Sequence, residues 1–63
     1  MEAAVVDLTT NIVINKIVAD AATDLAPDGT RLVDVPEGTV YDIGWLWDGV
    51  AFIPPVVEEI SGN

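Results

Sequence analysis

Apolar residues occur along this chain in short runs that are separated by turn-forming residues. The runs Ala3 to Leu8 and Ile12 to Ala19 are rich in valine and isoleucine, whose β-branched side chains favour extended backbone. Thr30 to Val35 has the same character. This spacing predicts a small all-β domain of four or five short strands with little or no helix.

The segment from Trp45 to Phe52 holds both tryptophans and the only phenylalanine, and its pattern predicts a C-terminal β-hairpin. Asp48-Gly49 between two apolar runs indicates a two-residue type I′ turn. Such a turn places Trp45 opposite Phe52, and we expect this pair to contribute most to stability. The side chains that share one face of the hairpin are then Trp45, Trp47, Val50 and Phe52.

Proline and glycine mark two further turns, one on each side of the strand at 30–35. In Ala26-Pro27-Asp28-Gly29 and in Val35-Pro36-Glu37-Gly38, proline presets φ at the second position of the turn. Asp20 to Ala26 is small and polar, and we expect a loop there. The residues expected in turns are Pro27, Gly29, Pro36, Gly38, Asp48 and Gly49.

The run Ile12 to Ala19 is apolar on both of its faces. Strict alternation puts Ile12, Ile14 and Val18 on one face together with Lys16. A strand that is apolar on both sides is buried on both sides or is covered by another subunit. The residues expected in the core or in a subunit interface are Ile12, Ile14, Ile17, Val18, Leu32, Val33, Tyr41, Trp45, Trp47, Val50 and Phe52.

The chain is short for its apolar content: it has 63 residues, of which 51% are apolar. A domain of this size buries only about 60% of its unfolded surface and usually needs a disulfide, a metal or a partner subunit. The sequence contains no cysteine and no histidine. Oligomerisation or docking on a larger body is therefore the expected way of completing the fold.

The charge balance is strongly acidic, because eleven carboxylates face only Lys16 and Arg31 and give a net charge of −9. Binding to nucleic acid or to an anionic membrane surface needs a basic footprint, so neither partner is expected. No apolar run approaches the ~20 residues of a membrane span, and the N-terminus has no basic segment typical of a secretory signal. We expect synthesis in a cytoplasm.

Candidate chemistry is sparse, and we expect neither an enzyme nor a cofactor. Asp20, Asp24 and Asp28 lack the alternating ligand positions of a calcium loop, so no metal is expected. Glu58-Glu59 has nothing to fix the separation of the two carboxylates for acid–base catalysis. The aromatic side chains Tyr41, Trp45 and Trp47 offer a core or interface, or alternatively a stacking platform for sugars.

Four segments carry a resemblance to a known group of proteins: Asn15–Asp20, Pro27–Val33, Gly44–Gly49 and Phe52–Pro55. Together they resemble a short module of tailed-phage virion proteins, found in tail-fibre, tail-fibre-assembly and small virion accessory proteins. The resemblance implies a non-enzymatic structural protein, first of all a capsid decoration (cement) protein that stabilises the shell. The alternatives are a tail-fibre, baseplate or fibre-assembly module and a carbohydrate-binding module.

The resemblance also implies a location in the virion and a homo-oligomer, with a trimer as the first expectation and the major capsid protein or another virion protein as partner. We divide the chain into an N-terminal extended arm or strand at 1–11, a β domain at 12–55 and an extended tail at 56–63. Apolar strand faces would be buried between subunits. Either Ala3 to Leu8 or Val56 to Ile60 would add to a strand edge on the capsid or on a neighbouring subunit.

Overall fold

The computed structural model describes residues 1–55, and this part of the chain contains five strands and no helix. The all-β prediction, with five short strands and a C-terminal hairpin, is confirmed. The strands are β1 (Glu2–Asp7), β2 (Val13–Val18), β3 (Thr30–Val35), β4 (Leu46–Trp47) and β5 (Phe52–Ile53).

The first three strands form an antiparallel sheet in the order β2-β1-β3, so that β1 is central. Its first residue, Glu2, pairs with Val18 of β2 on one side and with Val35 of β3 on the other. Both edges of β1 are therefore occupied within the chain. The expectation that Ala3 to Leu8 adds to the edge of another subunit is wrong, because these residues already pair on both sides.

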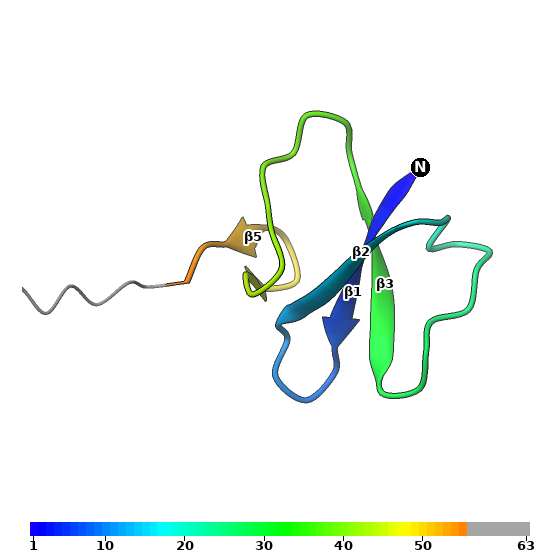
Figure 1. Ribbon diagram of the computed structural model, residues 1–63, viewed down its shortest axis with the longest axis horizontal. Helices are drawn as coiled ribbons and strands as arrows, with labels where there is room; N and C mark the ends of the chain where they lie inside the picture. Colours follow the sequence, from blue (N-terminus) through cyan, green and yellow to red (C-terminus); the bar gives the residue numbers. More distant parts are fainter. Residues whose placement is uncertain (56–63) are drawn as a thin grey trace, which may run out of the picture.

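The sheet lies between two other parts of the chain (Figure 1). The C-terminal hairpin β4-β5 lies on one side, and the connection at 19–29 lies on the other. The N–H of Ala21 in this connection donates to the Asp34 carboxylate of β3 at 2.9 Å. Side chains of β1 alternate between these two sides, and both sets are buried: Ala4 and Val6 face the hairpin side, and Ala3 and Val5 face the connection.

The main core lies between the sheet and the hairpin. Val33 and Val35 of β3 belong to it while Leu32 points to the opposite face, as period-2 alternation predicts. Val6 and Val13 are the largest completely buried side chains. The core consists of Ala4, Val6, Val13, Val33, Val35 and Tyr41, with Trp45, Trp47 and Phe52 packed against it.

A β-bulge changes the faces of β2. Val5 pairs with Asn15, but the next residue of β1, Val6, pairs with Val13, so Ile14 is the extra residue. The bulge brings Val13 onto the core side and leaves Ile14 exposed. The predicted face, in which Ile14 shares a side with Lys16 and Val18, is wrong because alternation does not continue through a bulge.

The C-terminal hairpin is present, but its loop is longer than the sequence suggested. Leu46 pairs with Ile53 and Trp47 with Phe52, which leaves a four-residue loop at 48–51. The Asp48 carboxylate accepts hydrogen bonds from two backbone N–H groups of this loop, each at 2.7 Å. Only Gly49 in the loop has a positive φ, of 99°, whereas a type I′ turn requires two such residues. Trp47, not Trp45, is therefore the residue opposite Phe52.

Each of the two proline turns begins one residue later in the chain than predicted. The Pro27 carbonyl accepts the N–H of Thr30, and the Pro36 carbonyl accepts the N–H of Thr39, each at 3.1 Å. Proline is thus the first residue of each turn and not the second. The segment 20–26 is a loop, as expected.

Candidate interaction surface

The residues predicted for the core or an interface divide into three groups. Val33 and Tyr41 are buried in the core, and the three aromatic residues of the hairpin pack against it. Ile17 and Leu32 are half-buried on the other side of the sheet. The exposed members are Ile12, Ile14, Val18 and Val50.

An exposed apolar surface forms where the hairpin joins the start of β2. The N–H of Val13 donates to the Trp45 carbonyl, and the N–H of Trp47 donates to the Asn11 carbonyl, each at 2.8 Å. This antiparallel pairing sets Ile12 beside Leu46. Leu46 is in turn paired with Ile53. We call the exposed residues of this surface the outer strip: Ile12, Ile14, Leu46 and Ile53.

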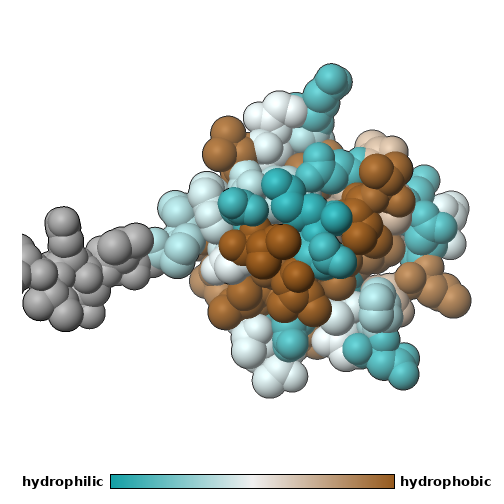
Figure 2. All heavy atoms as spheres, in the orientation of Figure 1, coloured by the Kyte–Doolittle hydropathy of each residue, from teal (hydrophilic) through white to brown (hydrophobic). Residues whose placement is uncertain are grey.

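The outer strip exposes large apolar side chains on three neighbouring segments. Its members are between 36% and 47% exposed. Figure 2 shows apolar side chains gathered over the start of β2 and the adjoining hairpin region. The flanking residues Thr10, Asn11 and Asn15 carry no charge. This surface therefore offers apolar contact area with uncharged polar side chains at its border.

The aromatic side chains contact one another. The Phe52 ring lies 4.7 Å from the Tyr41 ring and 4.7 Å from the Trp47 ring, measured between centroids. Tyr41 is only 7% exposed, so it is not available to stack on a sugar. The buried Trp47 Nε1–H has no hydrogen-bond partner among the described residues. These rings pack as a core cluster.

A polar cluster of Tyr41, Glu2, Lys16 and Asp42 connects the hairpin side of the molecule to the sheet. The Tyr41 hydroxyl donates to the Glu2 carboxylate of β1. The Lys16 ammonium lies 4.6 Å from the centre of the Tyr41 ring and 4.0 Å from the Asp42 carboxylate. Burial, and then the Glu2 carboxylate, raise the pKa of Tyr41 well above its ordinary value of 10.0. Sequence reasoning missed this cluster, since its members lie far apart in the chain.

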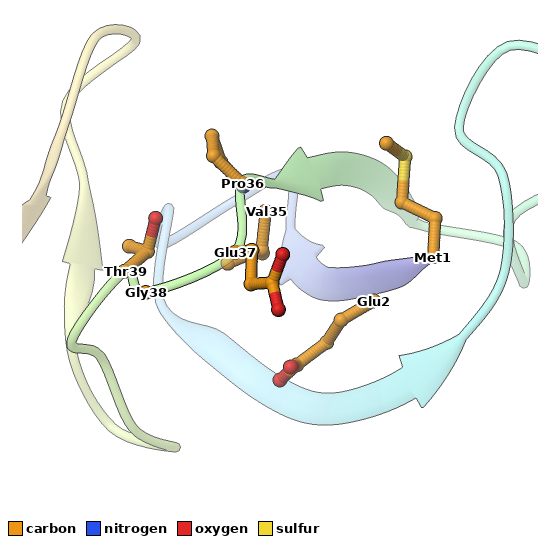
Figure 3. A pocket seen from close by; sticks show the side chains of 7 residues that line it. All are labelled: Met1, Glu2, Val35, Pro36, Glu37, Gly38 and Thr39. Atoms are coloured by element: carbon orange, nitrogen blue, oxygen red, sulfur yellow. The ribbon is translucent and has the colours of Figure 1, made fainter.

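A pocket of about 380 Å³ lies at one end of the sheet, lined by Met1, Glu2 and residues 35–39 (Figure 3). Figure 3 shows the side chains of Glu2 and Glu37 among those that line it. Glu2 is already bonded to Tyr41, and Glu37 is exposed. The Thr39 hydroxyl in its lining forms no hydrogen bond with either carboxylate among the described residues.

The acidic residues considered at the sequence level do not form a site in residues 1–55. No group of three potential ligands there is placed to hold a metal ion. The Asp24 carboxylate accepts the N–H of Asp20 at 2.7 Å, a bond within its own loop. Glu58-Glu59 lies outside the described residues. Nor does this part of the chain form a helix that is long and apolar enough to cross a membrane.

Comparison with known proteins gives no relative. No protein-family model, no curated protein and no solved structure matches this chain. The likeness to phage virion modules therefore stays a prediction from the sequence.

Asp48 provides a first test of the hairpin. The backbone N–H groups of Ala51 and Val50 lower the pKa of the Asp48 carboxyl below its ordinary value of 3.8. The stability that the ionised carboxylate contributes is therefore complete above pH 3.8, and it is lost as the pH falls through the lower pKa of the folded state. We expect Asp48→Ala to lower the melting temperature at about pH 7, and the difference from the wild type to shrink as the pH is lowered below 3.8. Thermal melts followed by tryptophan fluorescence measure this effect. Asp48→Asn keeps the acceptor oxygen and should melt between the two at neutral pH.

Proposed function

We propose that this chain is a non-enzymatic structural protein of a phage virion, first of all a capsid decoration protein that works as an oligomer. The outer strip carries the proposal. It is an exposed apolar surface on a small domain whose own core is already closed by the hairpin. Burying such a surface contributes roughly 25 cal/mol for each Å² of apolar area, and exposed apolar patches of this kind are typical of protein–protein contacts.

The charge distribution supports contact between like copies. The molecule carries a net charge of −9, and large like charge opposes association unless the carboxylates are kept apart. The outer strip and its flanking threonine and asparagine residues are uncharged. A contact made through this surface buries apolar side chains without burying a charge of the strip itself. The same contact suits an apolar patch on the major capsid protein.

The proposed trimer has a consequence for the contacts. In a three-fold ring each copy joins one surface to a different surface of its neighbour, because only two-fold contacts pair a surface with itself. The outer strip is then one half of the contact. The sequence resemblance supports the virion location.

Sedimentation of the full chain at about 10 µM, a concentration at which Kd values in the micromolar range can be detected, tests the proposal. We expect an oligomer for the wild type and a shift toward monomer for Leu46→Asp. Leu25→Asp is the matched control, because Leu25 is 95% exposed and lies in the connection at 19–29. Ile12→Thr, which retains a β-branched side chain, guards against misfolding of the first variant. A folded wild-type monomer of 6.7 kDa would overturn the proposal.

A further inference from the structure

The outer edge of β3 is unpaired in the described part of the chain. β3 forms hydrogen bonds with β1 on one side and ends the sheet on the other. An open strand edge presents a row of backbone N–H and C=O groups to any further strand. Short, exposed edges of this kind are the usual acceptors in strand addition.

The pattern of hydrogen bonds between β1 and β3 shows which backbone groups of β3 are available to a further strand. The N–H of Leu8 donates to the Gly29 carbonyl at 2.9 Å, in register with the β1–β3 ladder. Because bonded pairs alternate along an antiparallel ladder, every second residue after Gly29 turns its backbone groups away from β1. The N–H of Thr30 accordingly bonds to Pro27 instead. Leu32 and Asp34 therefore present their N–H and C=O groups at the open edge.

The opposite edge of the sheet is less accessible. The start of β2 pairs with the hairpin through Val13. Further along β2, the Asn15 side-chain oxygen accepts the N–H of Lys16 at 2.9 Å, so this donor is already used. The bulge at Ile14 also disturbs the edge. The edge of β3 is thus the better site for an added strand.

The charge on β3 indicates the chemistry of the strand it accepts. Arg31 is exposed, and among the described residues no carboxylate forms an ion pair with it. The other basic side chain, Lys16, lies 4.0 Å from Asp42. An acceptor edge with one free positive charge, and with Leu32 and Val33 beside it, suits an extended segment that combines apolar β-branched residues with carboxylates.

The chain itself contains such a segment, Val56-Val57-Glu58-Glu59. We propose that this segment of one copy adds antiparallel to the β3 edge of a second copy, with Glu58 opposite Arg31. In this register Val57 lies opposite Leu32 and exchanges both backbone hydrogen bonds with it. The proposal deepens the proposed function, on which it rests for the existence of an oligomer.

A neighbouring copy is the better recipient than the same chain. Figure 1 shows Pro54-Pro55 leaving β5 on the side of the hairpin away from β3. Because consecutive prolines favour an extended course, Pro54-Pro55 direct the chain away from the sheet. A tail that binds the edge of the next copy is a head-to-tail contact, which closes into rings such as the expected trimer.

Cysteine pairing tests the contact directly, because the chain has no native cysteine. The full chain with Arg31→Cys and Glu58→Cys is oxidised and separated without reductant. We expect disulfide-linked dimers and larger species. Leu25→Cys with Glu58→Cys is the matched control, since Leu25 is also exposed but lies off the edge, and this pair should give few disulfide-linked species. Equal cross-linking of both pairs, or a disulfide within single chains, would overturn the proposal.

Sedimentation separates failure of this contact from failure of self-association. Arg31→Glu removes the ion pair and sets two carboxylates opposite each other, so it should weaken association by at least about fivefold, and Arg31→Glu with Glu58→Arg should restore it. Ending the chain at Pro55 should weaken association more. If the wild type associates and neither change alters its mass distribution, the tail contact is wrong while the proposed function stands. A monomeric wild type contradicts both.

Discussion

Replacing Phe52 with alanine is expected to lower the free energy of unfolding by about 3–5 kcal/mol, as for other aromatic truncations in protein cores. The Phe52 ring lies 4.7 Å from both the Tyr41 ring and the Trp47 ring, so its removal opens contacts on two sides. A domain of this length has a total stability of roughly 3–9 kcal/mol. The expected loss is therefore a third or more of the total stability of the domain.

Urea unfolding followed by tryptophan fluorescence measures this effect, because Trp47 contacts the lost ring and Trp45 packs against the same core. Val50→Ala is the control in the same hairpin. Val50 is 85% exposed, and its truncation should change stability by no more than about 0.5 kcal/mol. Equal midpoints for the two variants would show that the aromatic cluster does not hold the hairpin.

The strands were predictable where the local signals agree. β3 begins and ends at the predicted residues, Thr30 and Val35, because a proline-glycine turn stands on each side of a β-branched run. β1 and β2 are each within two residues of their expected ends. Periodicity alone thus determines that strands exist, and turn chemistry determines where they stop.

The hairpin register failed for a local reason. Asp48-Gly49 suits a two-residue turn, but it equally suits a loop in which the aspartate carboxylate binds the following N–H groups. The second arrangement shifts Phe52 from Trp45 to Trp47. A side-chain-to-backbone bond of this kind has no signature in the pattern of apolar residues, so the sequence could not choose between the two loops.

The central position of β1 had a signal that sequence reasoning passed over. Ala3, Ala4, Val5 and Val6 form an uninterrupted apolar run, which is typical of a strand covered on both faces. The outer strip was predictable only in part. Ile12 and Ile14 were recognised, whereas Leu46 and Ile53 join them through the pairing of the hairpin with the start of β2. That pairing connects distant segments, and no local pattern specifies it.

Alkaline pH is expected to unfold this domain through Tyr41. The folded state keeps the phenol protonated because burial and the Glu2 carboxylate raise its pKa, while the unfolded chain ionises near 10.0. The stability contributed by the neutral phenol is complete below that value and is lost as the pH rises from there through the raised folded value. The loss is about 1.4 kcal/mol for each pH unit while the folded phenol stays protonated.

Two variants assign that loss to the Tyr41 hydroxyl and its partner. Tyr41→Phe should be less stable than the wild type at neutral pH, since it lacks the bond to Glu2, yet its stability should change less between about pH 10 and about pH 12. Glu2→Gln should show a shallower alkaline decline than the wild type, because the neutral amide opposes the phenolate less. The chain has a single tyrosine, so its ultraviolet phenolate absorbance reports this group alone. If that absorbance rises near pH 10 while the domain is still folded, Glu2 and burial do not hold the proton, and the contact between β1 and the hairpin side is weaker than the structure indicates.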